Sequence, residues 1–352
     1  GTDLPSGILT GVPQETPAER TFMMNTQSDT KPIIIALLPF QGEEREKLMQ
    51  AAPGYTFVWG GDGKIAPEAW ENAVAILGNP TPAQLKGCPQ LRWVQLGSAG
   101  ADSYCKPGVL PLEVTLTNAT GSYGHAISEH MVAVTMMLYK KLHLYRDNQH
   151  ASLWRDEGKV RSISTARVLV IGLGDIGGQY GMRMHQLGAS VTGITRTPRS
   201  TPAYAEKMGL LADLDQLLPE ADVVALALPN SPETTGLMNA RRLGLMKPGA
   251  ILLNVGRGSA VDTEALCDAL ESGHLSGAGL DVTDPEPLPK EHRLWRIPGA
   301  IITPHISGGF HMQETWDGIF GICLENLGRF AKGDSLTCLV DRNTGYQQKH
   351  NS

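Results

Sequence analysis

The sequence predicts an α/β protein with two doubly wound parallel-sheet domains. Short apolar runs alternate with helical segments along both halves of the chain, as expected for parallel strands joined by crossover helices. The length of 352 residues corresponds to two domains of about 150 residues each. Glycine is frequent, with 40 residues and no collagen-like period, which indicates many tight turns between short elements.

The composition excludes several classes of protein. A net charge of −6 argues against binding to nucleic acid or to an anionic membrane, because both need a basic face. No apolar run approaches the roughly 18 residues of a membrane span. The five cysteines are scattered and never form a CxxC pair, which fits neither a disulfide framework nor a zinc site. We therefore expect a soluble cytoplasmic protein without a metal site.

The first half of the chain begins with a segment that does not resemble a folded domain. Residues 1–30 have little periodic apolar sequence and no signal-peptide core, so we expect an N-terminal tail, with Met23 and Met24 as candidate native starts. A helix is expected at 43–52. The strands of this half are expected at 33–38, 55–59, 74–77, 91–96 and 114–116.

A long helical pattern at 128–148, with Ser128 as its N-cap, marks the boundary between the halves. The final helix is expected at 314–331 and should return to the first domain. We assign 31–128 and 309–340 to a substrate-binding domain, 129–308 to a dinucleotide-binding domain, and 341–352 to a polar C-terminal tail. The strands of the second half are expected at 167–171, 190–195, 223–228, 251–254, 278–281 and 300–303.

A glycine-rich loop follows the strand at 167–171 directly and opens a helix. In a GxGxxG loop, the first glycine permits a tight turn, the second lets a pyrophosphate approach the backbone, and the third allows close helix–strand packing. The helix N-terminus presents free N–H groups to phosphate. This context predicts a dinucleotide site. Its residues are Gly172, Leu173, Gly174, Asp175, Ile176 and Gly177.

The end of the next strand indicates which dinucleotide binds. An acidic residue there would hold the ribose 2′-hydroxyl of NAD. The sequence instead has Thr195, Arg196 and Arg199, a hydroxyl and two guanidinium groups that suit a 2′-phosphate. We therefore favour NADP(H) and keep NAD(H) open, since both arginines could also be solvated surface charges.

Further polar residues follow the carboxyl ends of the predicted strands, the edge where open parallel sheets bind ligands. Arg257 offers a planar fork of donors for a carboxylate or a carbonyl. His305 can exchange a proton near neutral pH, and Glu286 could bond its other ring nitrogen and favour the imidazolium. Each has an ordinary structural interpretation on its own; together they favour an active site. Leu228, Pro229, Asn230, Val255 and Asp281 occupy the same edge.

Four motifs in this order resemble the D-2-hydroxyacid dehydrogenase family, which includes glyoxylate/hydroxypyruvate reductases and 3-phosphoglycerate dehydrogenases. The resemblance implies a flavodoxin-like substrate domain and a Rossmann domain. It also implies that Arg257 binds substrate, that Glu286 and His305 form the catalytic dyad, and that Asp281 holds the nicotinamide carboxamide. His305 would then contact both cofactor and substrate. The motifs are GLGDIG at 172–177, NVGRG at 254–258, GLDVTDPEPLP at 279–289 and TPHISGG at 303–309.

Two features outside these motifs also resemble the family. Ser98, Ala99 and Gly100 match its substrate-carboxylate loop, where small residues let backbone N–H groups reach an anion. Trp154 resembles an aromatic residue that some members insert into the partner subunit's site, although a packing role is equally open. With the long apolar helix, it predicts a homodimer through 128–150.

The expected activity is NAD(P)H-dependent reduction of a small 2-keto acid to the D-2-hydroxy acid, with His305 as general acid. Two alternatives remain at this point. One is an enzyme similar to formate dehydrogenase, against which Glu286 counts. The other is a catalytically weak nucleotide-sensing corepressor or scaffold on the same fold. The sequence leaves the identity of the keto acid open.

Overall fold

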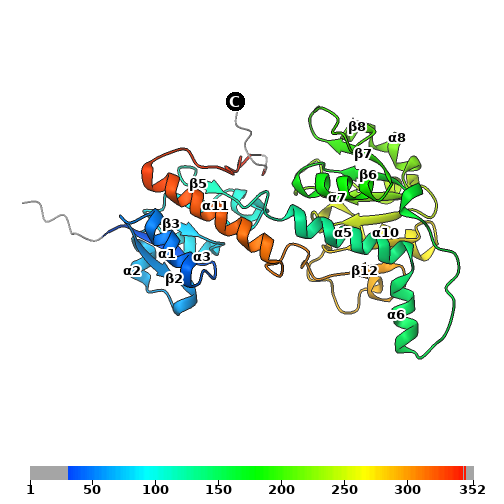
Figure 1. The fold of residues 1–352 in the computed structure, drawn as a ribbon, viewed down its shortest axis with the longest axis horizontal. Coiled ribbons are helices and arrows are strands. Elements are labelled where there is room, and N and C mark those ends of the chain that lie inside the picture. Colours follow the sequence, from blue (N-terminus) through cyan, green and yellow to red (C-terminus); the bar gives the residue numbers. More distant parts are fainter. Residues whose placement is uncertain (1–30, 344, 346–352) are drawn as a thin grey trace, which may run out of the picture.

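The structure is a computed structural model that describes residues 31–343 and 345. The predicted tail 1–30 lies outside the described residues, as do residues 344 and 346–352 of the predicted C-terminal tail. Two all-parallel sheets of five and seven strands form the centres of two lobes (Figure 1). The predicted α/β class with two parallel sheets is confirmed. Across the described residues, no helix is long and apolar enough to cross a bilayer.

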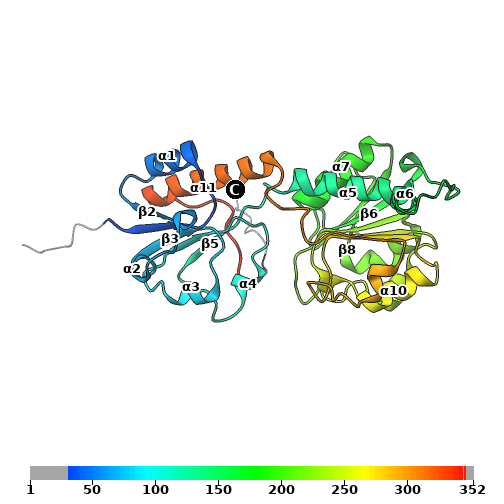
Figure 2. The same cartoon turned by 90° about the horizontal axis from the view of Figure 1, so that it is seen from below.

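The five-stranded sheet has the order β2-β1-β3-β4-β5. The first strand along the chain, β1, therefore lies inside the sheet, and β2 forms its edge. Figure 2 shows α1 and α11 on one face and α2, α3 and α4 on the other. All five strands lie where the sequence predicts them, within three residues at each end. The elements are β1 (Ile33–Ala36), α1 (Gly42–Ala51), β2 (Thr56–Trp59), α2 (Pro67–Glu71), β3 (Ala73–Leu77), α3 (Pro82–Lys86), β4 (Trp93–Gln95), α4 (Asp102–Cys105) and β5 (Thr115–Thr117).

The seven-stranded sheet has the order β12-β11-β10-β9-β6-β7-β8. The sequence predicted six of these strands and missed β8. That strand is a four-residue edge strand that pairs with β7 and contains an exposed lysine and a glycine, so its apolar signal is weak. The strands are β6 (Arg167–Ile171), β7 (Ser190–Thr195), β8 (Lys207–Leu210), β9 (Val223–Leu226), β10 (Ile251–Asn254), β11 (Gly277–Leu280) and β12 (Ala300–Ile302).

Helices cover both faces of this sheet, with α5 and α7 on one face and α10 on the other (Figure 2). Short 3₁₀ turns lie at Gly60–Asp62, Ile163–Thr165, Leu211–Asp213, Leu218–Glu220, Gly258–Ala260 and Arg293–Arg296. The helices are α5 (Gly124–Tyr139), α6 (Leu142–His150), α7 (Asp175–Gln186), α8 (Leu214–Leu217), α9 (Ala240–Leu245), α10 (Thr263–Glu271) and α11 (Gln313–Lys332).

The single long helix predicted at 128–148 is instead two helices, and its predicted N-cap, Ser128, is also wrong. The chain breaks between α5 and α6 at Lys141, whose φ of 55° is left-handed. Ser128 is not the N-cap, because α5 begins four residues earlier and the Ser128 hydroxyl donates to the His125 carbonyl inside the helix. The Gly124 N–H donates to the Asp175 carboxylate of α7 at 2.9 Å, a tertiary cap that local sequence does not reveal.

The helix α5 lies flat on the seven-stranded sheet. A Cβ at Gly279 of β11 would come within 2.3 Å of the Val134 side chain, and one at Gly277 within 2.8 Å of Leu138. The small residues of β11 therefore allow the close approach. The final helix α11 returns to pack beside α1, where Trp316 and Phe40 have ring centroids 5.5 Å apart. The exact domain boundaries stay a prediction.

Candidate active site

The glycine loop after β6 lies at the switch point of the seven-stranded sheet, between the branches that begin with β7 and β9. Gly172 has a φ of +95°, and a Cβ there would come within 2.5 Å of the Ala227 carbonyl oxygen. A Cβ at Gly177 would lie 2.0 Å from the Gly172 carbonyl oxygen. At Gly174, by contrast, nothing lies within 4 Å. The loop is therefore closed on its protein side and open beside the start of α7, which fits a dinucleotide pyrophosphate.

The side chain of Asp175 points away from that opening. Its carboxylate accepts hydrogen bonds from the Gly124 N–H at 2.9 Å and from the Gln179 amide at 2.8 Å. The side chain therefore joins α5 to α7. The first N–H groups of α7, including that of Ile176, remain the donors available to a phosphate.

The residues predicted to bind a 2′-phosphate surround the end of β7. Arg199 donates to the Leu173 carbonyl of the glycine loop at 2.7 Å, which places its guanidinium beside that loop. Arg196 is exposed directly after β7. Thr195 is buried, and its hydroxyl donates to the Thr197 carbonyl at 2.9 Å, so it shapes the turn.

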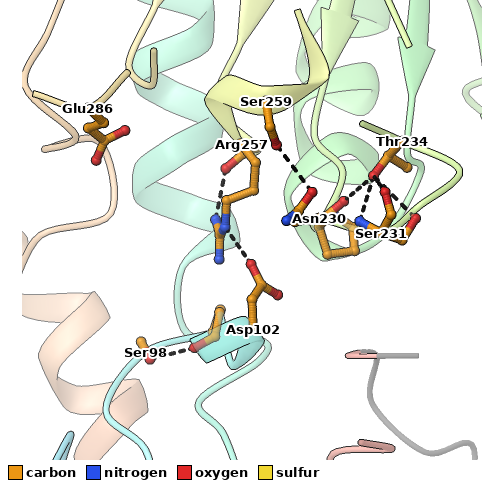
Figure 3. A network of polar contacts seen from close by, with 12 residues as sticks. Ser98, Asp102, Asn230, Ser231, Thr234, Arg257, Ser259 and Glu286 are labelled. Atoms are coloured by element: carbon orange, nitrogen blue, oxygen red, sulfur yellow. Dashed lines mark hydrogen bonds and ion pairs between the residues drawn. The ribbon is translucent and has the colours of Figure 1, made fainter. Parts of the chain in front are cut away.

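The residues after β9 and β10 form a connected polar network (Figure 3). The Leu228 backbone packs against Gly256, where a Cβ would come within 2.4 Å of the Leu228 carbonyl oxygen. The Pro229 carbonyl accepts a hydrogen bond from Thr234. The Asn230 amide oxygen accepts one from the Ser259 hydroxyl at 3.1 Å. These contacts fix the two loops that flank Val255 and Arg257.

Arg257 projects from the seven-stranded lobe toward the other lobe (Figure 3). The Asn254 amide donates to the Arg257 carbonyl at 2.9 Å and thereby shapes the turn that carries it. The Arg257 Nε donates to the Asp102 carboxylate at 2.7 Å, and Nη1 donates to the Gly256 carbonyl at 2.8 Å. A Cβ at Gly100 would lie 2.0 Å from Nη2, so the predicted substrate loop runs directly beside the guanidinium.

His305 and Glu286 form the pair that the sequence predicts. The His305 Nδ1 and the Glu286 Oε1 are 2.6 Å apart, and both side chains are about half exposed. His305 has a left-handed φ of 53°, and its N–H donates to the Asp281 carbonyl at 2.9 Å. The short contact between Nδ1 and the Glu286 carboxylate therefore fixes the orientation of the His305 ring and of its second nitrogen, Nε2.

Asp281 lies beneath the loop that carries His305 and is only 2% exposed. Its carboxylate accepts hydrogen bonds from the Thr303 hydroxyl at 2.6 Å and from the Ile306 N–H at 2.9 Å, and it also accepts from Ser307. It therefore anchors the loop that carries His305, and the carboxamide contact implied by the resemblance stays a prediction. Behind it, the His130 Nε2 lies 3.4 Å from the Thr303 hydroxyl, and burial lowers the pKa of His130.

The substrate loop of the five-stranded lobe is held by amides. The Asn79 amide donates to the Ser98 hydroxyl at 2.9 Å, and its oxygen accepts from the Gly97 N–H at 3.0 Å. Ser98 in turn donates to the Gly100 carbonyl at 2.7 Å, while Asn118 donates to the Ala99 carbonyl at 2.7 Å. The Ser98 hydroxyl therefore uses its hydrogen bonds to hold the shape of the loop.

Sequence reasoning missed three residues at this edge: Asn79, Asp102 and Asn118. Asn79 and Asn118 closely follow the ends of β3 and β5, so the strand-end rule that singled out Arg257 and His305 would also find them. Asp102 begins α4, seven residues after β4, and only the fold brings it to this edge.

Trp154 lies away from these groups in this chain. It is fully exposed after α6, which Figure 1 shows extending from the seven-stranded lobe. It lines a hollow of about 650 Å³ together with Tyr145, Asn148, Gln149, Ser152, Leu153, Arg155 and Asp156. Among residues 31–343 and 345, no group of three His, Cys, Asp or Glu side chains could hold a metal ion.

Comparison with known proteins shows the family to which the chain is similar. The sequence model of the family described as "D-isomer specific 2-hydroxyacid dehydrogenase, NAD binding domain" matches residues 132–307. A hydroxypyruvate reductase from Blautia hydrogenotrophica is 30% identical over 271 residues, which cover 73% of this chain and 81% of that protein. A D-3-phosphoglycerate dehydrogenase from Mycobacterium leprae is 34% identical over 224 residues, 63% of this chain; the chain spans only 42% of its length.

A solved structure extends the likeness to both lobes. The D-isomer specific 2-hydroxyacid dehydrogenase from Xanthobacter autotrophicus Py2, in complex with NADPH and MES, is 28% identical with a TM-score of 0.75. The comparison covers 90% of this chain and all of that one.

Proposed function

The chain belongs to the D-isomer specific 2-hydroxyacid dehydrogenase family, and we propose that it reduces a small 2-keto acid to the D-2-hydroxy acid with NADPH. The observation that carries the proposal is the His305–Glu286 pair at 2.6 Å, on the same strand-end edge as Arg257. This edge combines a proton donor with a carboxylate-binding fork, the two groups that the reduction of a keto acid needs.

The glycine loop supports dinucleotide binding, because it is open at Gly174 beside the start of α7. When bound, a reduced nicotinamide dinucleotide supplies the hydride for C2 of the keto acid. Arg196 and Arg199 support the choice of NADPH, since a 2′-phosphate placed beside the glycine loop would lie near the guanidinium of Arg199. The relative from Xanthobacter autotrophicus Py2 was crystallised with NADPH.

The residues of the chain account for the other steps. Arg257 holds the substrate carboxylate and polarises the carbonyl. The carboxylate of Glu286 holds His305 through Nδ1, which leaves Nε2 to donate a proton to the oxygen on C2 as the hydride arrives. His305 is then neutral and takes a new proton from solvent, to which its half-exposed side chain has access.

A second copy of the chain is the proposed partner. Two of the side chains that line the hollow beside α6, Leu153 and Trp154, are exposed and apolar, and exposed apolar side chains that lie together on a surface indicate an interaction site. A two-fold dimer would cover it and could bring Trp154 to the partner's site. Sedimentation at micromolar concentration should show a dimer; a monomer contradicts this arrangement. The exposed apolar residues are Leu142, Leu153, Trp154 and Val160.

A substrate panel tests the proposed function. Glyoxylate, hydroxypyruvate and a branched 2-keto acid are each incubated with NADPH or NADH, and oxidation of the cofactor is followed. Turnover of at least one keto acid is the expected result. Chiral analysis of the product from hydroxypyruvate or from the branched keto acid should show the D-isomer, whereas glycolate from glyoxylate is achiral. In a parallel incubation of formate with NADP⁺ or NAD⁺, reduction of the cofactor without any keto-acid reduction would instead favour the formate dehydrogenase alternative. Nucleotide binding without any turnover would favour the corepressor or scaffold.

A further inference from the structure

Tyr123 is the residue at which the chain enters α5 after crossing from the five-stranded lobe (Figure 1). Its carbonyl accepts the Ile127 N–H of the first helical turn at 3.0 Å, and the N–H of the next residue, Gly124, donates to the Asp175 carboxylate of α7. The side chain is buried, with 6% exposed. The backbone of Tyr123 is therefore fixed by the seven-stranded lobe, which also carries His305.

The hydroxyl of Tyr123 reaches the other lobe. It donates a hydrogen bond to the carbonyl of Gly97, the residue directly before the predicted substrate loop 98–100. The Gly97 N–H donates to the Asn79 amide oxygen at 3.0 Å, so side chains hold both backbone groups of Gly97. Burial raises the pKa of the Tyr123 phenol above its usual value of about 10, so the hydroxyl remains a donor at neutral pH.

The peptide that Tyr123 holds also carries the first donor of the substrate loop. The peptide bond between Gly97 and Ser98 is trans, and the C=O and N–H of a planar trans peptide point in opposite directions. Among the described residues, nothing accepts a hydrogen bond from the N–H groups of Ser98, Ala99 or Gly100. These groups are available to an anion, and Tyr123 fixes the orientation of the first.

The ring of Tyr123 packs against the segment that carries His305. A Cβ at Gly308 would lie 3.1 Å from the Tyr123 Cδ1, closer than Cβ atoms usually approach, so the backbone of Gly308 rests on the ring. The same segment is anchored by Asp281, whose carboxylate accepts from the Ser307 N–H at 3.1 Å. One side chain thus contacts the substrate loop through its hydroxyl and the His305 segment through its ring.

We propose that Tyr123 is a positioning residue that sets the substrate loop and the His305 segment relative to each other. The inference rests on the proposed function, in which the substrate binds between loop 98–100 and His305. The hydroxyl orients a donor of the loop and therefore acts on substrate binding. The ring supports the segment of the proton donor and therefore acts on the proton-transfer step. The two parts of the side chain should affect different kinetic constants, whereas a residue that only stabilises the fold would not separate them.

Tyr123→Phe and Tyr123→Leu separate the two parts of the side chain. Phenylalanine keeps the ring and leaves the buried Gly97 carbonyl without its donor. We expect the KM for hydroxypyruvate at saturating NADPH to rise about fivefold to tenfold, the effect of one lost hydrogen bond, while kcat stays within about twofold of wild type. Leucine also removes the ring, so kcat should fall as well, by roughly tenfold or more, as the proton donor loses its alignment.

Tyr180→Phe is the matched control. Tyr180 is fully buried in the seven-stranded lobe, and its hydroxyl lies 2.9 Å from the Thr135 hydroxyl. Loss of this hydrogen bond should lower Tm and leave the KM for hydroxypyruvate unchanged. If Tyr123→Phe does not fold, Gly308→Ala takes its place: the added methyl group displaces the Tyr123 ring, and the KM for hydroxypyruvate should rise by about fivefold.

The outcomes separate the two proposals. A folded wild-type protein that reduces no keto acid contradicts the proposed function itself. An active wild-type protein with an unchanged KM in Tyr123→Phe, or in Gly308→Ala where that variant replaces it, overturns the role of Tyr123 alone. The same increase in KM in Tyr180→Phe also overturns it, because a general loss of stability would then explain both variants. A wild-type kcat in Tyr123→Leu overturns the role of the ring.

Discussion

The two strand-end edges that face each other across the cleft differ in the chemistry they carry. The edge of the seven-stranded sheet presents Arg257, Glu286 and His305, each fixed by contacts of its own lobe. The edge of the five-stranded sheet presents small residues, the amides of Asn79 and Asn118, and the carboxylate of Asp102. Under the proposed function, we infer a division between the lobes: the seven-stranded lobe performs the chemistry, and the five-stranded lobe selects the molecule on which it is performed.

The strongest test of that division removes the proton donor. His305→Ala should lower kcat for keto-acid reduction by about 10²–10⁴-fold at neutral pH, the usual contribution of a positioned general acid. His311→Ala, an exposed histidine in the next segment, is the matched control and should retain activity. Steady-state kinetics measure both. If kcat of the His305→Ala variant were within twofold of the wild-type value, a group other than His305 would be the proton donor.

The second test replaces Arg257, the guanidinium on the same strand-end edge. Arg257→Lys keeps the charge and loses the planar pair of donors, so kcat should fall and KM should rise together. A loss of one charge-assisted hydrogen bond predicts a decrease of roughly tenfold to a hundredfold in kcat/KM. Arg242→Lys, which alters an arginine paired with Asp215 outside the cleft, provides the comparison. Equal kinetics in the two variants would remove Arg257 from the site.

The third test concerns the cofactor side of the seven-stranded lobe. Wild-type protein should prefer NADPH over NADH by about tenfold or more, after solvent screening of the two arginine contacts. Thr195→Asp combined with Arg196→Ala and Arg199→Ala should reverse the preference, because a carboxylate there accepts from the ribose hydroxyl. The KM for the keto acid is the internal control and should be the same in the variant as in the wild-type protein. A wild-type preference for NADH would contradict the proposal.

A smaller effect is expected from the five-stranded lobe. Asn79→Ala removes two hydrogen bonds that shape the substrate loop, at 2.9 Å and 3.0 Å, without removing a group of the catalytic pair. KM should rise by roughly fivefold, the value of about 1 kcal/mol, while kcat changes little. Asn72→Ala, whose amide donates to the Glu68 carbonyl in the same lobe, controls for a general loss of stability. If kcat fell and KM held, the proposed division between the lobes would be wrong.

The smallest effect is on stability. Burial lowers the pKa of His130 below its usual 6.5, so the unfolded chain binds this proton more readily than the folded one. The stability that the neutral ring confers is present above about pH 6.5 and is lost as pH falls through the lowered pKa. His130→Gln removes this titration. The decrease in Tm from about pH 7 to pH 5 should therefore be smaller in the variant; an equal decrease would show that another group titrates.

The sequence by itself determined the parts of this protein that depend on local pattern. Strands buried on both faces appear as nearly continuous apolar runs, which is why β6 and β10 were predicted with their observed bounds. The glycine loop was equally clear, since its turn, its close packing and its opening each require a missing side chain at a fixed spacing. Arg257, Glu286 and His305 were found because the ends of parallel strands meet at one edge.

The tertiary structure alone decided what depends on contacts between distant segments. The start of α5 is set by Asp175, 51 positions away, and not by Ser128 within the predicted helix. The strand β8 forms at an edge where pairing with β7 compensates for weak apolar content. The ion pair between Asp102 and Arg257 joins two lobes across 155 positions. No local periodicity encodes a contact over such a sequence separation. It arises from how the two sheets are placed, and it puts a carboxylate against the guanidinium of Arg257.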